Sequence, residues 1–213
     1  MTRKGWVYLG FFGALLAAFY GGLILATDFG KVELPVLAKV RPFHFVRQDG
    51  EEVTERDVAG RVYVAEFFFT TCKGICPKMN RNMRAVYGAF GSDRRMLILS
   101  HTVDPATDSV ARLRRYADSM GVDGARWWFL TGSKEALYRT ARESYLLDSP
   151  DNSSRNISEQ FIHTQFFALV DGDGQVRGIY DGLQQDELAT LRAHAAALLK
   201  ELSSEGGERG VGP

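Results

Sequence analysis

The stretch that decides the fold is Arg61–Pro77, which reads RVYVAEFFFTTCKGICP. Its first half, Arg61–Phe69, is β-branched and aromatic with little alternation, which indicates a central strand covered on both faces. A short loop is expected at Thr70–Ile75. Cys76-Pro77 then opens a helix that runs to about Phe90, because a proline in the first turn of a helix loses no hydrogen bond. The stretch therefore predicts a strand–loop–helix unit, with one cysteine in the loop and one at the start of the helix.

Strands and helices alternate outward from this unit. A hairpin around an Asp-Gly turn is expected before it, over about residues 43–53. The elements expected after it are a strand at Met96–Ser100, a helix at Ser109–Met120, a strand at Trp127–Leu130, a helix from Ser133 to about Ser144, a surface loop at Asp148–Glu159, a strand at Phe161–Val170, a turn at Asp171–Gly174, a strand at Gln175–Tyr180 and a helix over about Gln185–Leu202. Such alternation implies a parallel core sheet, to which the closing hairpin adds antiparallel strands. The predicted fold class is α/β, with a thioredoxin-like fold.

Composition excludes several classes of protein. The chain has 213 residues, with 26 basic against 26 acidic side chains and a pI near 6.9. A nucleic-acid binder would carry a basic excess, so no nucleic-acid partner is expected. Two cysteines are too few for a multi-disulfide scaffold or a four-thiolate zinc site.

The amino terminus predicts a single transmembrane anchor. Residues 5–27 carry no charge, and a helix over them is about 34 Å long, enough for a hydrocarbon core of about 30 Å. A cleaved signal peptide is the alternative, but its apolar region is about 7–15 residues long and needs a better cleavage site than Ile24-Leu25-Ala26. Arg3 and Lys4 place the amino terminus in the cytoplasm by the positive-inside rule. We therefore expect an inner-membrane, single-pass protein whose soluble domain lies in the periplasm or on an equivalent exported side.

The expected organisation follows from these segments. Residues 1–28 form the anchor, 29–40 a linker, 41–202 the thioredoxin-like domain and 203–213 a disordered tail rich in Gly, Ser and Glu. In an exported compartment, two spaced cysteines can cycle between dithiol and disulfide or hold a soft metal ion.

Cys72 and Cys76 carry the expected chemistry. The unpaired amides and the macrodipole of a helix amino terminus favour thiolate, and Lys73 adds a cation beside Cys72. Three intervening residues, among them Gly74, let both sulfurs face one point. A deprotonated pair can attack a disulfide or bind a soft ion such as Cu(I).

A histidine is expected to complete the site. His163 opens the strand Phe161–Val170, which as an antiparallel strand begins beside the end of its parallel neighbour, where the Cys72 loop leaves. Cys72, Cys76 and His163 are thus the predicted metal ligands. His101, after the strand Met96–Ser100, is a candidate for the surrounding shell, and Asp104 and Asp108 are expected to cap the next helix.

These residues resemble those of the Sco (SenC-type) family, membrane-anchored thioredoxin-fold copper proteins of cytochrome c oxidase assembly. The resemblance rests on Phe69-Thr70-Thr71-Cys72, Cys76-Pro77, Val103-Asp104-Pro105 with Asp108, and His163 before a strand ending in Asp171-Gly172-Asp173-Gly174. It implies a copper ion held by Cys72, Cys76 and His163. It also implies delivery of copper to the binuclear copper centre of cytochrome c oxidase subunit II, or reduction of that subunit's cysteine pair.

Two functions stay open at this point. The first is a copper metallochaperone. The second is an enzyme, a thiol–disulfide oxidoreductase using Cys72 and Cys76 as a redox-active pair without copper. The family often has Pro-Asp after the first cysteine, whereas Lys73-Gly74 stands here, and this exchange of a negative for a positive charge favours the reductase. A peroxiredoxin is disfavoured because Phe69 and Lys73 stand where its Thr is required, and structural zinc is disfavoured because only three ligands are on offer.

Overall fold

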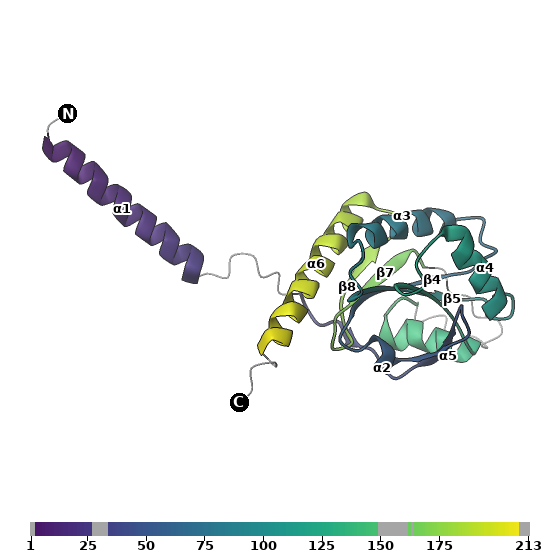
Figure 1. Ribbon diagram of the computed structural model, residues 1–213. Coiled ribbons are helices and arrows are strands. Elements are labelled where there is room, and N and C mark those ends of the chain that lie inside the picture. The colour runs from purple at the N-terminus through teal and green to yellow at the C-terminus, as the bar shows by residue number, and fades with distance from the viewer. Residues whose placement is uncertain (1–2, 27–33, 149–161, 163, 209–213) are drawn as a thin grey trace. The chain divides into compact units, whose positions relative to one another are not determined.

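The computed structural model describes residues 3–26, 34–148, 162 and 164–208 (Figure 1). The chain divides into two compact units, Met1–Glu33 and Leu34–Pro213. The first unit holds helix α1, Arg3–Ala26, whose segment Arg3–Gly22 is long and apolar enough to cross a membrane. The helix expected from the apolar run is therefore present.

The second unit is an α/β domain built on one sheet. Its eight strands lie in the order β1-β8-β7-β4-β5-β6-β2-β3. The central strands β4, β5 and β6 are parallel, and every other pairing is antiparallel. The elements are β1 (Ala38–Lys39), β2 (His44–Arg47), β3 (Glu52–Thr54), α2 (Glu55–Val58), β4 (Val62–Phe68), α3 (Cys76–Ala89), β5 (Met96–Thr102), α4 (Val110–Met120), β6 (Trp127–Thr131), α5 (Lys134–Arg139), the π-helical turn η1 (Thr140–Ser144), β7 (Phe166–Val170), β8 (Gln175–Asp181) and α6 (Gln185–Glu208). The predicted thioredoxin-like α/β fold is confirmed.

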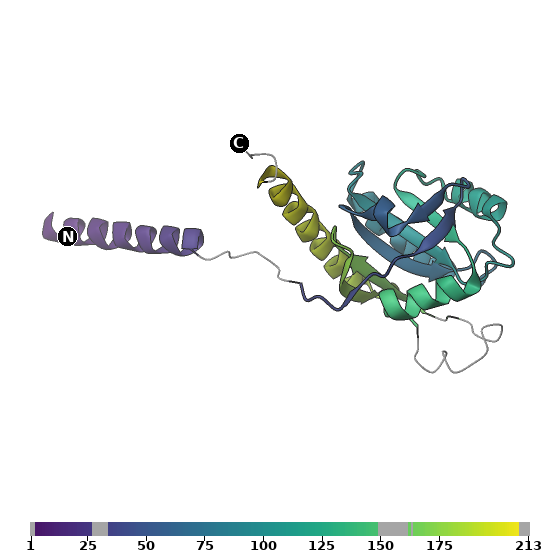
Figure 2. The same cartoon turned by 90° about the horizontal axis from the view of Figure 1, so that it is seen from below.

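Helices cover both faces of this sheet (Figures 1 and 2). Helices α3, α4 and α6 pack on one face, where Met83, Leu113 and Leu191 are fully buried. Helices α2 and α5 pack on the other face. β4 alternates between these two cores and is buried along its whole length, as its largely apolar sequence predicts.

Both predicted boundaries of the domain differ from the structure. The folded unit begins at Leu34, because Leu34 is buried against the α6 face and β1 pairs with β8, so part of the predicted linker belongs to the domain. Helix α6 continues to Glu208, beyond the predicted end at Leu202. Ser203 and Ser204 donate hydrogen bonds to helix carbonyls and so tolerate this extension. The segment 203–208 is therefore helical, not part of a tail.

The strand predicted at Phe161–Val170 is shorter than expected. β7 begins at Phe166 and pairs with β4 only through Tyr63, Val64 and Ala65. Beyond that register β7 remains paired with β8 alone, so the last residues of β4, Glu66–Phe68, have no partner on β7. The predicted surface loop at Asp148–Glu159 falls almost wholly outside the described residues.

Candidate functional site

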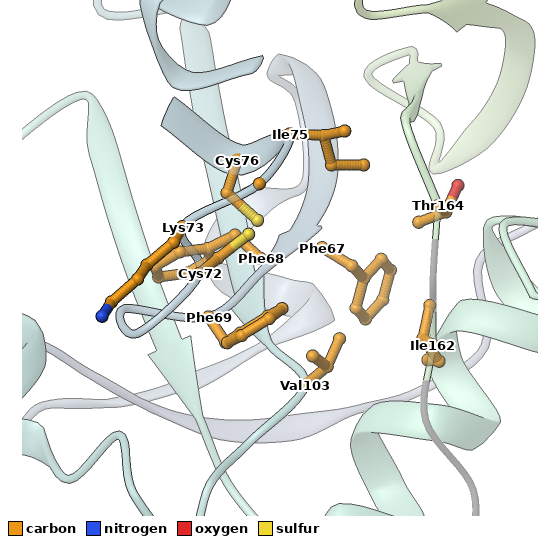
Figure 3. Close-up of a pocket in the computed structure, with 11 residues that line it drawn as sticks. Phe67, Phe68, Phe69, Cys72, Lys73, Ile75, Cys76, Val103, Ile162 and Thr164 are labelled. Atoms are coloured by element: carbon orange, nitrogen blue, oxygen red, sulfur yellow. The ribbon is translucent and has the colours of Figure 1, made fainter. Parts of the chain in front are cut away.

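The two cysteines lie where β4 ends and α3 begins, beyond the part of β4 that pairs with β7. The chain leaves β4 at Phe68, and α3 starts at Cys76 with Pro77 in its first turn, as predicted. Both cysteines line a cavity of about 340 Å³ (Figure 3). The other residues that line it are mostly apolar: Phe67, Phe68, Phe69, Lys73, Gly74, Ile75, Val103, Ile162 and Thr164.

The two sulfur atoms point toward one another, and both thiols are free (Figure 3). Partial burial raises the pKa of Cys72, but hydrogen bonds from the Cys76 thiol and from the backbone amides of residues 74–76 outweigh it and lower that pKa overall. Burial raises the pKa of Cys76, its hydrogen bond to Cys72 adds to the rise, and the Phe69 amide opposes it. Cys72 is partly exposed whereas Cys76 is only 5% exposed. The pair therefore combines an accessible, acidic thiol with a buried, weakly acidic one.

The Cys76 thiol and the amides at the start of α3, not Lys73, stabilise the Cys72 thiolate. No side chain caps α3 at Ile75, so the first amides of the helix are free to bond the sulfur. Lys73 is exposed, and its side chain extends away from both sulfurs (Figure 3). The expected cation beside Cys72 is therefore directed to solvent.

His163, the third predicted ligand, lies outside the described residues. The antiparallel pairing of β7 with β4, from which its position was inferred, is present. Its two neighbours in the sequence, Ile162 and Thr164, both line the cysteine cavity. Among the described residues there is no group of three or more His, Cys, Asp or Glu side chains that could hold a metal ion. The ligand set Cys72, Cys76 and His163 therefore stays a prediction.

His101 does not belong to the cysteine site. It lies inside β5, fully buried on the sheet face that α3 does not cover, stacked on Phe67 with ring centroids 5.0 Å apart. Burial lowers its pKa to about 4, so the ring is neutral. The alternation of β5 turns the His101 side chain into the opposite core, so it does not line the cavity and contacts it only through Phe67, which does.

Asp108 does not cap α4, and this prediction is also wrong. Ser109 is the N-cap residue, without a side-chain cap bond, and the carboxylate of Asp108 is fully buried. It accepts hydrogen bonds from the Thr70 amide at 3.1 Å, the Thr70 hydroxyl at 2.5 Å and the Thr102 hydroxyl at 2.6 Å. Arg112 donates to the Thr70 hydroxyl at 2.6 Å. Asp108 thus ties the start of the cysteine loop to the end of β5.

Asp104 shapes the turn that follows β5. Its amide donates to the Thr102 hydroxyl at 3.0 Å, and its carbonyl accepts from the amides of Thr107 and Asp108. The carboxylate contacts the Thr107 amide at 3.4 Å. It stabilises a turn, not the helix terminus.

Sequence reasoning missed Glu66. This carboxyl is fully buried in the middle of β4, on the sheet face that also carries Cys76. Burial raises its pKa to about 7, and the hydrogen bond from the Ser100 hydroxyl, at 2.5 Å, opposes that rise. The available signal was a lone acidic residue inside an apolar run, which places a carboxyl in a core.

The domain has one sheet covered by helices and two facing thiols where a strand meets a helix. This arrangement defines a thioredoxin-like protein whose thiols can react with disulfides or bind a soft metal ion. The SCO1/SenC family model matches residues 33–198. The chain is 31% identical over 158 residues to the SCO1 protein homolog of Bacillus subtilis, covering 72% of this chain and 79% of that protein. It is 28% identical over 160 residues to a putative copper-binding protein of Stutzerimonas stutzeri, with coverages of 71% and 76%. The chain belongs to the SCO1/SenC family.

Solved structures agree with this assignment. The solved structure of BsSco superposes with a TM-score of 0.62 at 28% identity, over 76% of this chain and 96% of that one. BsSco is described as a member of the Sco family of cytochrome c oxidase assembly proteins, and as containing a disulfide switch. The fold and the family expected from the sequence are therefore both confirmed.

Proposed function

We propose that this protein is a membrane-anchored copper metallochaperone of cytochrome c oxidase assembly, which delivers copper to the binuclear copper centre of subunit II. The observation that carries the proposal is the pair of facing sulfurs at the mouth of a mostly apolar cavity (Figure 3). Thiolates are the ligands that Cu(I) prefers, and helix amides that stabilise a thiolate also favour its binding. The copper-binding relative and the oxidase-assembly role of BsSco support the assignment.

Copper is cargo in this proposal, held by Cys72, Cys76 and His163. Cys76 is buried and fixes one side of the site, whereas Cys72 is partly exposed and meets the acceptor first. Transfer then proceeds by ligand exchange, in which thiolates of the acceptor replace those of the chaperone without a change in oxidation state. The neighbours of His163 at the cavity support its place as the third ligand.

An anaerobic Cu(I) competition titration of the full, reduced chain in detergent tests this function. We expect one copper per chain, and none once Cys72 and Cys76 form a disulfide. His163→Ala should weaken binding by at least roughly tenfold, the scale on which loss of metal-site partners acts. His44→Ala is the matched control, because His44 is exposed and paired with Glu52. Full copper affinity in Cys72→Ser or Cys76→Ser would overturn the proposal.

A second function, reduction of the subunit II cysteine pair, is favoured by the asymmetry of the two thiols. An accessible thiol of lowered pKa beside a buried one of raised pKa suits attack by Cys72 and resolution by Cys76. In Cys76→Ser, a peptide carrying the oxidised subunit II cysteine pair should be trapped as a mixed disulfide. Cys72→Ser should trap none. Equal trapping by both variants would contradict the assignment of roles.

We also propose that α1 anchors the protein with its amino terminus in the cytoplasm. At 24 residues the helix is about 36 Å long, and its charges, Arg3 and Lys4, lie at its start. A membrane-impermeant maleimide should then label Cys72 in intact spheroplasts. Labelling that requires lysis would place the domain on the cytoplasmic side.

A further inference from the structure

A second cavity lies at the opposite end of the sheet from the cysteines. Its volume is about 580 Å³, and of the described residues that line it four are arginines and none is acidic. Arg61 precedes β4, and Arg94 and Arg95 precede β5, whereas Arg47 is the last residue of β2. The cysteine loop leaves the other end of β4, so the length of that strand, about 20 Å, separates this arginine cavity from the cysteines.

Trp128 of β6 also lines the arginine cavity and holds two of its arginines. The guanidinium carbons of Arg47 and Arg61 lie 5.0 Å and 5.8 Å from the centre of the Trp128 ring. The indole N–H of Trp128 is buried and has no hydrogen-bond partner among the described residues. The aromatic ring therefore keeps two cations at one cavity, together with an N–H donor that lacks an acceptor.

The positive charge of the arginine cavity is only partly neutralised. Arg47 and Arg95 form ion pairs with carboxylates outside the cavity lining. These carboxylates are Asp49, Glu51 and Asp93. In the part of the chain that the structure describes, Arg61 and Arg94 form no ion pair, and Asp57 interacts with Arg61 only through space. Two guanidinium groups are thus available to bind an anion.

The chain enters the domain at this same end of the sheet. Leu34 is the first residue of the domain, and the guanidinium of Arg177 donates to the Leu34 carbonyl at 2.6 Å and to the Asp171 carboxylate at 2.7 Å. In the turn that follows Asp171, the carbonyl of Gly172 accepts from the amide of Gly60 at 2.9 Å, and Gly60 lines the arginine cavity. Leu34 and the arginine cavity are therefore connected through one turn.

The sequence limits how far this end of the domain can lie from α1. Only residues 27–33 separate Ala26, the last residue of α1, from Leu34, and a fully extended chain over them reaches at most about 28 Å. Guanidinium groups bind phosphate oxygens in a bidentate manner, and an anionic bilayer surface attracts basic side chains. The phosphates of the bilayer in which α1 lies are therefore the anions closest to hand.

We propose that the arginine cavity binds the headgroups of anionic phospholipids and so docks the domain on the bilayer surface. The inference rests on the proposed anchoring by α1 and does not depend on copper delivery. Docking through this end directs the cysteine cavity away from the lipid. The cysteines then meet an acceptor about 20 Å above the headgroups, at a height set by the length of β4.

Hydrogen–deuterium exchange of the full, reduced chain in lipid nanodiscs tests the docking. The amides of residues 56–61 and 91–95, the segments that carry Arg61 and Arg94, should exchange more slowly in phosphatidylglycerol than in phosphatidylcholine. Residues 70–75 of the cysteine loop should exchange alike in both lipids. Equal exchange of the two arginine segments in both lipids would overturn the proposal and leave an acidic protein as the occupant.

Inorganic phosphate, added to the phosphatidylcholine nanodiscs, distinguishes a lipid from a free anion. We expect it to leave the exchange of residues 56–61 and 91–95 unchanged, because the headgroups are held at the surface at a far higher local concentration. Protection by inorganic phosphate equal to that in phosphatidylglycerol would overturn membrane docking, since the cavity would then be a site for a small anion.

The double variant Arg61→Gln, Arg94→Gln removes the two unpaired cations. Each arginine near an anionic surface strengthens binding about fivefold, so the ratio of docked to free domain should fall roughly 25-fold and the protection should be lost. The matched control Arg81→Gln, Arg115→Gln removes the same charge from exposed positions on α3 and α4 and should keep the protection. Equal loss in both double variants would overturn the assignment to the arginine cavity.

High salt provides a readout that needs no variant and so does not depend on how the variants fold. At about 1 M NaCl the Debye length is about 3 Å, so the protection of the wild type in phosphatidylglycerol should disappear. Protection that persists at this salt concentration would contradict docking through the arginines. Failure of the anchoring itself is distinguished from these outcomes, because the chain would then not remain with the nanodiscs during purification.

Discussion

Asp108 and Glu66 are both fully buried carboxyl groups near the cysteine loop, and they differ in how their oxygens are satisfied. Asp108 accepts three hydrogen bonds, from Thr70 and Thr102, so both of its oxygens have partners. Glu66 accepts one, from Ser100, and keeps a bare oxygen. A saturated carboxylate fixes the position of its donors, whereas an unsaturated one is free to exchange a proton. The same kind of residue thus holds the cysteine loop in one region and stays incompletely hydrogen-bonded in the core in the other.

The largest effect expected is on Asp108. Asp108→Ala leaves the half-buried Thr70 amide and hydroxyl and the buried Thr102 hydroxyl without their acceptor and removes the ion pair with Arg112, which should lower the free energy of unfolding by about 3 kcal/mol. Urea unfolding of the full chain, followed by the fluorescence of the buried tryptophans, measures this loss. The control is Asp104→Ala, whose carboxylate makes one long contact and should change stability by less than about 1 kcal/mol. Equal losses of unfolding free energy in the two variants would show that the hydrogen bonds of Asp108 do not stabilise the fold more than the single contact of Asp104.

Glu66 should instead change how the free energy of unfolding depends on pH. Its pKa of about 7 in the folded chain lies above the ordinary value of 4.5, so the folded state binds more protons between these values. Stability therefore falls as pH rises from 4.5 to 7, by about 3 kcal/mol at about 1.4 kcal/mol per pKa unit. Glu66→Gln should lack this fall.

His101 affects the pH dependence of stability in the opposite direction to Glu66. The quantity to measure is therefore the difference in free energy of unfolding between wild type and Glu66→Gln. Its pKa of about 4 lies below the ordinary 6.5, so the folded state binds fewer protons and stability rises over that window. Wild type minus Glu66→Gln cancels this contribution. If the difference in free energy of unfolding does not vary with pH, the pKa of Glu66 is not raised. The contrast between Glu66 and Asp108 would then be smaller than stated.

The smallest effect is expected at Lys73. Its side chain points away from the sulfurs, so Lys73→Ala should move the midpoint of Cys72 alkylation by less than about half a pH unit, in keeping with the small contribution of exposed charges. Iodoacetamide alkylation rates across pH measure it, with Lys78→Ala as the control on α3. A larger shift confined to Lys73→Ala would mean that the Lys73 ammonium stabilises the Cys72 thiolate, as the sequence suggested, and that the helix amides contribute less.

Local patterns in the sequence predicted much of this arrangement. The apolar run of β4, the Cys76-Pro77 helix start and the start of a helix at Ser133 all appear where expected, because each depends on neighbours within a few residues. The start of β7 at Phe166 was not predictable in this way, since it depends on where pairing with β4 stops.

The roles of individual polar residues could be assigned only from the tertiary structure. Asp108 reads as a cap, but its partners Thr70 and Thr102 come from two other parts of the chain. His101 stands at the carboxyl end of a strand like a site residue, yet the pleat of β5 turns it into the opposite core. Neither outcome follows from spacing, because both depend on which sheet face a side chain enters.

The sequence by itself determined the α/β class, the apolar amino-terminal helix and the placement of two cysteines at a strand–helix junction, because hydrophobic periodicity and proline position act locally. Only the tertiary structure decided that the Cys76 thiol and the helix amides, not Lys73, stabilise the Cys72 thiolate, and that Glu66 is buried on the sheet face that carries Cys76 with an oxygen unpaired. Burial and hydrogen bonding set these properties. Both are created when distant segments pack together, and no local pattern encodes them.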